Sequence, residues 1–375
     1  MVVDEVTRGL FAAWRWQIDA ILADAVPHGP LALVNFPNHR NAGDPAIWLA
    51  EREALSRVGP VRYRCSWDGF SHRALRRRVG DGAILLNGGG NFGDLYAGQQ
   101  GLREHILATC RANPVVQLPQ SIWFDDPANL DRVRRLVAGH GQVTILCRDR
   151  RSEHLAREQF EARVVYCPDM VLGWALARRP APAAVDILWL ARRDREVVAQ
   201  PPDAAPDVEV CDWLAPLPGE REWPAGRRLA WEITNRWSGA ARRAPRLASA
   251  TWRLPASRFE PLAEAWVARA RRVLARGRVV VTDRLHAHVL ALGMGIPTVV
   301  LDSRYGKVHA IARESTSASP LTHLAGGTGE ALDLARALVA AQAEDPPPQA
   351  GGPPAPAVPA GGDGAGGPDG TGGAG

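Results

Sequence analysis

Lysine is almost absent from this chain of 375 residues. Of its 45 basic residues only Lys307 is a lysine, and all the others are arginines. Arginine shares GC-rich codons with the abundant alanine, glycine and proline, so codon composition contributes to this bias. The chain also lacks any motif of a DNA- or RNA-binding module. Its net charge of +5 therefore fits small anionic substrates, and we expect no nucleic-acid partner.

Cysteine pairs and long apolar runs are missing as well. The five cysteines form no C-x-x-C pair, which is typical of reduced core thiols in a cytosolic protein. They are Cys65, Cys110, Cys147, Cys167 and Cys211. No uncharged apolar run is long enough to span a bilayer, and the first residues, with Asp4 and Glu5, lack the apolar core of a secretory signal. We expect a cytoplasmic protein without a transmembrane segment.

The length and composition fit a globular protein of two domains. Residues 1–176 alternate between strand and helix patterns, and residues 185–344 repeat this alternation. Residues 177–184, rich in arginine and proline, interrupt it and are predicted to be a linker. Residues 345–375 consist mostly of proline, glycine and alanine, so they are predicted to form a disordered tail.

The segment Val279–Leu301 has the pattern of a strand, a turn, a helix and a second strand. Its first β-branched run leads into Arg284 and His286, and its second apolar run follows Pro297. Ligands of open parallel sheets bind beyond the carboxyl ends of the strands, where helix N-termini favour anions. Arg284 brings a planar fork of donors and His286 a titratable proton, so the functional site is expected here.

Other roles for these side chains are open at this point. Arg284 could pair with Asp283 or with another surface acid, and His286 could cap the helix. His286 and His288 would point about 200° apart around a helix, so they are not expected to share a metal ion.

Five strand patterns in the N-terminal half each end in small, polar or charged residues. The first, Leu31–Phe36, is followed by a loop that ends at Asp44 and Pro45, a helix-start signal in which Asp44 is the predicted N-cap. The other four are Ala83–Leu86 followed by Gly89, Gly90 and Asn91, Val115–Leu118 followed by Gln120 and Ser121, Val143–Cys147 followed by Arg148, and Arg163–Cys167 followed by Asp169. In a parallel sheet these ends share one edge, so these side chains are predicted to lie together.

The glycine run at 88–93 matches the spacing G-x-G-x-x-G of dinucleotide-binding loops. However, it does not open the first βαβ unit, and the next strand ends in Gln117 and Gln120 rather than in an acid for a ribose. The expected role of these glycines is a close approach of the backbone to a ligand or a helix.

An amphipathic helix is predicted over Thr7–Val26. It could lie on a membrane surface and so allow peripheral association with a membrane-bound glycan assembly, but packing on its own domain is the favoured use.

Taken together, the motifs resemble the polysaccharide pyruvyl transferase family. The matching segments lie in family order between Leu31 and Lys307, and Arg284-Leu-His286 with Gly295-Ile-Pro297 is the most specific of them. The others are Asn41-Ala-Gly-Asp44, Gly88-Gly-Gly90, Pro119-Gln-Ser121, Arg148-Asp149 with Ser152, Asp169, and Tyr305 to Lys307.

The resemblance implies an α/β fold of two Rossmann-like domains that face each other across a cleft, as in the GT-B architecture. It implies transfer of the enolpyruvyl carbons of phosphoenolpyruvate onto two hydroxyls of one sugar, which forms a pyruvate ketal and releases phosphate. It also implies that Arg148, Arg284 and His286 contact the donor. The expected catalytic residues are His286, Arg284 and Asp44, and the expected substrate-binding residues are Arg148, Gly89, Gly90, Asn91, Gln120, Ser121, Asp169 and Lys307.

The residue types suit this chemistry. Phosphoenolpyruvate carries a carboxylate and a phosphate close together, and two guanidinium groups could bind both bidentately. Its methylene carbon must receive a proton, for which protonated His286 is a reasonable donor, while Asp44 or Asp169 could accept the proton of the sugar hydroxyl. The scheme requires no metal and no cofactor beyond the donor. Residues 201–253 match no pattern, so the acceptor sugar stays open.

Two other functions fit the same features. A GT-B glycosyltransferase that uses a nucleotide sugar would share the architecture and an Arg/His phosphate-binding turn. A non-catalytic accessory of a polysaccharide assembly complex would bind sugar or phosphate without turnover. Calorimetric titration with phosphoenolpyruvate and with a nucleoside diphosphate distinguishes the pyruvyl transferase from the glycosyltransferase. Acceptor-dependent phosphate release distinguishes the pyruvyl transferase from the non-catalytic accessory.

Overall fold

The computed structural model describes residues 3–344 apart from 193–196, 199, 203–204, 214–228, 230, 235, 238–245, 247–252 and 305. The predicted disordered tail at 345–375, Tyr305, and much of the unmatched segment 201–253 therefore lie outside the described residues.

The first sheet consists of seven parallel strands in the order β2-β1-β3-β5-β6-β7, with β4 paired to β5. Its strands are β1 (Leu31–Phe36), β2 (Val61–Ser66), β3 (Ile84–Leu86), β4 (Gly89–Gly93), β5 (Val115–Trp123), β6 (Val143–Cys147) and β7 (Arg163–Tyr166). The helices around it are α1 (Glu5–Ala25), α2 (Gly43–Leu55), α3 (His72–Val79), α4 (Ala97–Thr109), α5 (Pro127–His140) and α6 (Arg150–Gln159), with a 3₁₀ turn η1 (Met170–Gly173).

Successive residues of a strand face opposite sides of the sheet, and in β1 both sides are buried. Leu31 and Leu33 pack into a core with α1, α2 and η1. Ala32 and Val34 pack into a second core with α3, α4, α5 and α6. This double burial explains why the strand sequences read as nearly continuous apolar runs.

The second sheet has five parallel strands in the order β12-β11-β10-β8-β9. They are β8 (Val185–Leu190), β9 (Val208–Cys211), β10 (Gly277–Thr282), β11 (Thr298–Leu301) and β12 (Thr322–Ala325), and the helices are α9 (Arg253–Leu274), α10 (Leu285–Leu292), α11 (Lys307–Ser315) and α12 (Thr328–Glu344). The predicted strand-helix-strand unit is β10-α10-β11. The fold is thus α/β with parallel sheets, as expected.

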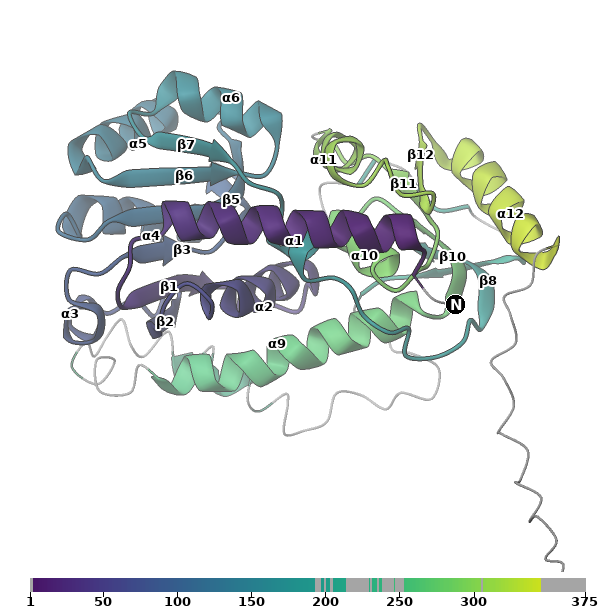
Figure 1. The fold of residues 1–375 in the computed structure, drawn as a ribbon, viewed down its shortest axis with the longest axis horizontal. Helices are drawn as coiled ribbons and strands as arrows, with labels where there is room; N and C mark the ends of the chain where they lie inside the picture. Colours follow the sequence, from purple (N-terminus) through teal and green to yellow (C-terminus); the bar gives the residue numbers. More distant parts are fainter. Residues whose placement is uncertain are drawn as a thin grey trace, which may run out of the picture.

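The first sheet with its helices forms one half of the molecule, and the second sheet with its helices forms the other. Helices α1, α9 and α10 connect these two halves. The long helix α9 packs on α2 and β2 of the first half, and α10 packs on α2 and η1 (Figure 1). Helix α1 lies on η1, and its Trp14 indole donates a hydrogen bond of 2.8 Å to the Ser315 carbonyl. The apolar face predicted for this helix is therefore buried within the protein.

Several local predictions were wrong. The strand Val115–Leu118 was expected to end at Leu118, but β5 continues through Pro119 to Trp123 and pairs with a strand, β4, within the glycine run. Asp44 was the predicted N-cap of the next helix, but α2 begins one residue before it and Ala42 takes the N-cap position. Helix α9 begins at Arg253 and accommodates Pro261 in its interior.

All five cysteines are free, as predicted, and four of them are buried. Among the helices of the described residues, none combines the length and the apolar character that a membrane crossing requires.

Candidate active site

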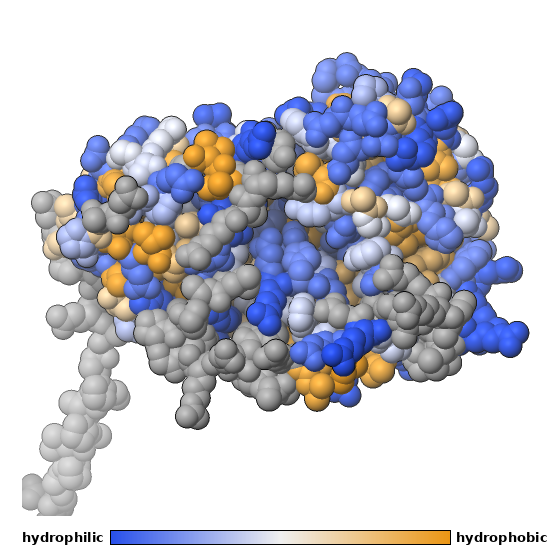
Figure 2. Space-filling model, turned by 180° about the vertical axis from the view of Figure 1, so that it is seen from behind, coloured by the Kyte–Doolittle hydropathy of each residue, from blue (hydrophilic) through white to orange (hydrophobic). Residues whose placement is uncertain are grey.

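A pocket of about 860 Å³, its open mouth included, is lined by the carboxyl ends of strands from both sheets. The first sheet contributes residues that follow β1, β3 and β6, together with part of β4. The second contributes residues that follow β8, β9, β10 and β11. Figure 2 shows hydrophilic residues gathered in the recess between the two halves.

Most of the predicted site residues meet in this pocket. Those that line it are Asp44, Gly90, Asn91, Arg148, Arg284, His286 and Lys307. The other four, Gly89, Gln120, Ser121 and Asp169, lie directly behind the lining. Gln120, for example, donates a hydrogen bond of 2.6 Å to the side-chain oxygen of Asn91.

Asp169 joins the two halves of the site. Its Oδ2 accepts a hydrogen bond of 2.7 Å from Arg148 Nη1 and lies 3.3 Å from His286 Nε2. Burial alone would raise the pKa of Asp169, but His286, Arg148 and the Val171 N–H hold it well below its usual range. The carboxylate is therefore charged at neutral pH and can hold a protonated imidazole in place.

Arg148 is 3% exposed, and only part of its guanidinium is used by the protein. Its Nε donates to Ser121 Oγ at 2.9 Å and its Nη1 to Asp169, whereas its Nη2 has no partner among the described residues. A Cβ on Gly90 would lie 3.2 Å from that Nη2 and 4.0 Å from Lys307 Nζ. The backbone of Gly90 thus lies beside two cationic groups, where an anion would also be attracted.

The turn between β10 and α10 presents the most specific motif. Arg284 occupies the N-cap position of α10, and its Nη2 lies 3.3 Å from a carboxylate oxygen of Asp212. His286 is in the first turn, so the reading of His286 as the helix cap is wrong. A Cβ on Gly43 would lie 2.7 Å from His286 Nδ1, so the start of α2 packs directly against the imidazole ring.

His288 has a different environment from His286. It is fully buried between the hydroxyls of Thr298 and Thr316, at 2.6 and 2.8 Å from its ring nitrogens. Burial lowers the pKa of His288 to about 3, so the ring is neutral and structural. Within the described part of the chain no group of three or more His, Cys, Asp or Glu side chains is arranged to hold a metal ion.

Asp44 faces the same pocket from the first turn of α2, where a negative charge is favoured by the helix dipole. Its Oδ2 lies 3.1 Å from His39 Nε2. Partial burial would raise the pKa of Asp44, but the hydrogen bond to His39 and the charges of His39, His286 and Arg148 lower it to about 2.

Several pocket residues were not predicted from the sequence. They include Asn35, His39, Tyr96, Gln99 and Arg192. Asn35 is the one non-glycine residue with a positive φ, 77°, in the part of the chain described, and the register of β1 with β2 shifts there. An asparagine at a strand end tolerates this backbone conformation, so the residue type was the available signal.

Two buried ionisable side chains support the glycine segment from behind. Glu51, fully buried on α2, accepts a hydrogen bond of 2.7 Å from the Gly88 N–H. Burial raises the pKa of Glu51 well above its usual range in spite of that bond. Arg103 of α4, 2% exposed, donates to both the carbonyl and the side chain of Asn91, at 3.2 and 3.0 Å.

Comparison with known proteins gives a consistent result. The profile of the family described as polysaccharide pyruvyl transferase matches residues 41–217 and 264–305, more than half of the chain. Pyruvyl transferase 1 of Schizosaccharomyces pombe is 31% identical over 293 residues, which cover 74% of this chain and 67% of that protein. The putative pyruvyl transferase EpsO of Bacillus subtilis is 27% identical over 288 residues, or 76% and 85% of the two chains.

Among solved structures, the uncharacterized protein KP1_0663 of Klebsiella pneumoniae is similar with a TM-score of 0.54. The match covers 84% of this chain and 99% of that one, at 17% identity. At this level of identity the similarity concerns the fold alone.

Proposed function

This chain belongs to the polysaccharide pyruvyl transferase family, and we propose that it uses phosphoenolpyruvate to form a pyruvate ketal on a sugar of a polysaccharide or glycan precursor. In the proposed reaction, two hydroxyl oxygens of one sugar bond to C2 of the donor, and phosphate leaves. The donor would act as a substrate, with no further cofactor.

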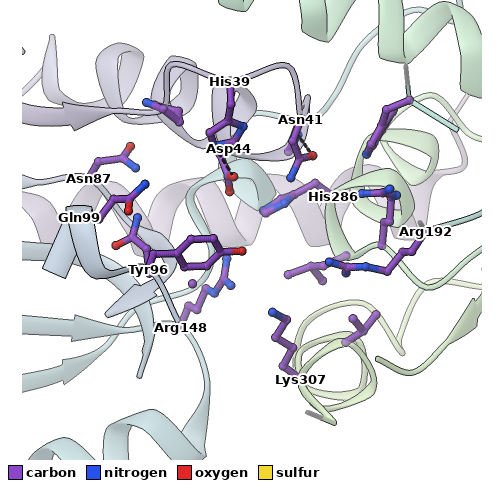
Figure 3. Close-up of a pocket in the computed structure, with 18 of the residues that line it drawn as sticks. His39, Asn41, Asp44, Asn87, Tyr96, Gln99, Arg148, Arg192, His286 and Lys307 are labelled. Carbon is purple, nitrogen blue, oxygen red and sulfur yellow. Dashed lines mark hydrogen bonds and ion pairs between the residues drawn. The ribbon is translucent and has the colours of Figure 1, made fainter. Parts of the chain in front are cut away.

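The cationic side of the pocket is the observation that carries this proposal. Arg148, Arg284 and Lys307 line it together with Arg192 and His286 (Figure 3). A donor with a phosphate and a carboxylate brings several negative charges, and planar guanidinium groups match both. Most of the donor would be held by groups from the second half, with Arg148 reaching it from the first half.

His286 would supply the proton that the donor needs. Protonation of the methylene carbon C3 leaves positive charge at C2, where the first hydroxyl oxygen then bonds. The second hydroxyl displaces the phosphate from C2 and closes the ketal ring. Asp169, at 3.3 Å from His286 Nε2, would keep the imidazolium in position between the two halves.

We further propose that the two sheets belong to two Rossmann-like domains in a GT-B-like arrangement, with the donor bound between them. Residues 177–184 contain neither helix nor strand, which is compatible with a connecting linker. The free, dispersed cysteines support a cytoplasmic location.

Calorimetry combined with a phosphate-release assay tests the function. Phosphoenolpyruvate should bind to the purified protein and uridine diphosphate should not. Phosphate should be released only when a suitable acceptor is added from a panel of p-nitrophenyl hexosides and 2-acetamido hexosides. Binding of the nucleotide in place of the donor would favour a glycosyltransferase. Donor binding without release for any acceptor would favour a non-catalytic accessory.

A further inference from the structure

The pocket contains two histidine–aspartate pairs, and only one of them is needed to protonate the donor. We propose that the other pair, His39 with Asp44, removes the proton from the acceptor hydroxyl, with His39 as the base and Asp44 as the residue that positions it. This inference rests on the proposed function, because it assigns the second proton transfer of that reaction.

The two pairs differ in their access to solvent. The side chain of His286 is 12% exposed and that of Asp169 is 2% exposed, so this pair is enclosed between the halves. The side chain of His39 is 43% exposed and that of Asp44 is 34% exposed, so this pair lies at the open part of the pocket. This open side gives room for an acceptor that is part of a glycan, and His39 can pass a proton on to water.

The surroundings of His39 and Asp44 also fit a sugar better than an anion. The lining near this pair includes three neutral side chains that form hydrogen bonds, Asn41, Asn87 and Gln99, although the charges of Arg148 and His286 also act on Asp44. Figure 3 shows His39, Asn41 and Asp44 across the pocket from Lys307. Neutral amides bind hydroxyl groups in either direction, whereas the negative charge of Asp44 disfavours a second anion beside it.

Asp44 itself is a poor candidate for the base. With a pKa lowered to about 2, its carboxylate has little affinity for a proton near neutral pH. The same negative charge, 3.1 Å from His39 Nε2, can fix the orientation of the ring and stabilise it once it has accepted a proton. This is the usual division of roles between a histidine base and the carboxylate that orients it.

The proton balance of the first step then closes within the pocket. The acceptor O–H proton moves to His39, and the electron pair of that bond forms the new bond from oxygen to C2 of the donor. The π electrons between C2 and C3 take a proton from His286, which makes C3 a methyl group. One proton is taken up on the exposed side and one is given on the enclosed side, so no external acid, base or oxidant is required.

His39→Gln tests the assignment, because an amide keeps a hydrogen bond to Asp44 but cannot accept the proton. We expect phosphoenolpyruvate affinity within a few-fold of wild type, and acceptor-dependent phosphate release slower by roughly 10²–10⁴-fold, the usual contribution of a positioned base. His39→Gly should be equally slow, and added imidazole should restore part of its rate, since the position is open to solvent. His154→Ala, which changes an exposed histidine of α6 paired with Glu158, is the matched control and should keep full activity.

The outcomes separate this inference from the proposed function. If wild-type protein releases phosphate with an acceptor and His39→Gln does so within three-fold of that rate, the function stands and the role of His39 is wrong. A slow His39→Gly protein that imidazole does not accelerate also overturns it, because a purely structural role would give that result. If the wild-type protein releases no phosphate with any acceptor, the proposed function fails and the assignment fails with it.

Discussion

At the scale of single residues, the site depends on Asp169, a carboxylate that is almost completely buried. Asp169 is shared by Arg148 and His286, which come from different sheets. Removing one partner of a buried ion pair leaves an uncompensated charge, which is far more costly than the loss of an exposed pair. The position of His286 relative to Arg148 is therefore fixed before any substrate arrives.

Replacing His286 with asparagine should separate its chemical role from a structural one. Because Arg284 takes the N-cap position, the helix start does not depend on residue 286. We expect donor affinity to change by only a few-fold and phosphate release to slow by roughly 10²–10⁴-fold, as for loss of a positioned acid. Arg284→Lys, in contrast, should act mainly on donor affinity, because it loses the planar fork. Turnover of His286→Asn close to the wild-type rate would contradict the catalytic role.

His288 should make the stability of the protein sensitive to mild acid. Its folded pKa of about 3 is below the unfolded value of about 6.5, so between these values the unfolded state binds more protons. This contribution is complete above pH 6.5, and each pH unit below it should cost about 1.4 kcal/mol of unfolding free energy. Urea unfolding at pH 7.5 and 5.0 measures the loss, which His288→Gln should reduce. Equal pH dependence in both proteins would show that the ring is protonated in the fold.

The site residues at strand ends could be predicted from the sequence, whereas the buried side chains that hold the loops of the site in place could not. Arg148, Asp169 and Arg284 follow apolar runs, so their place at the sheet edge could be inferred. Glu51 and Arg103 lie within helices, and nothing in a helix sequence shows that a charged residue faces a buried loop. Glu51 bonds to the Gly88 N–H, and Arg103 bonds to the carbonyl and the side chain of Asn91, groups that only the folded chain brings near.

At the scale of elements, the parallel sheets were predictable and the glycine strand was not. Apolar runs of the right length predicted β1, β5 and β6, although β5 continues beyond the expected end. Strand β4 has the sequence GGNFG, which carries no strand signal, and it exists because its backbone pairs with the extended end of β5. Here tertiary pairing overrides local preference.

Two glycines of β4 should respond to substitution in different ways. Gly93 has a φ of 116°, and a Cβ there would lie 1.8 Å from the Trp123 carbonyl oxygen. Gly93→Ala should therefore disrupt the pairing of β4 with β5 and lower the free energy of unfolding by several kcal/mol. A Cβ at Gly90 would meet only the ends of side chains, Arg148 Nη2 at 3.2 Å and Lys307 Nζ at 4.0 Å, so a small shift of the guanidinium would accommodate it. It should fold with near-native stability and bind phosphoenolpyruvate at least ten-fold more weakly.

Thermal unfolding and calorimetry of both variants check this contrast. Similar losses of stability at the two positions would show that the glycines serve the strand alone. Unchanged donor affinity in Gly90→Ala would place the donor away from β4.

At the scale of the whole molecule, the ends of the chain should differ in importance. Residues 345–375 contain almost no large apolar side chain, so burial cannot offset an ordering cost of roughly 1–2 kcal/mol per residue. A protein ending at residue 344 should keep the melting temperature and the activity of the full chain. A clear drop in either would show that this segment docks on the protein.

Removal of α1 should have the opposite effect. Phe11, Ile18 and Leu22 of this helix are at most 2% exposed, and each such side chain contributes about 1.5–3 kcal/mol by burial. The helix also reaches the second half, where Trp14 donates to the Ser315 carbonyl and Thr7 bonds to Ser319. The loss is comparable with the whole stability of a domain, which is about 5–15 kcal/mol.

A protein that starts at Gly29 should therefore lack a cooperative thermal transition and should not bind phosphoenolpyruvate. The chain that ends at residue 344 is its matched control, because it loses about as many residues, almost none of which is a large apolar residue. If the protein without α1 unfolds cooperatively at the wild-type temperature, the helix is an accessory and the two halves hold together without it. If it unfolds at a lower temperature but binds the donor normally, α1 stabilises the fold without fixing the geometry of the pocket, and the alignment of His286 with Asp169 must then depend on α9 and α10.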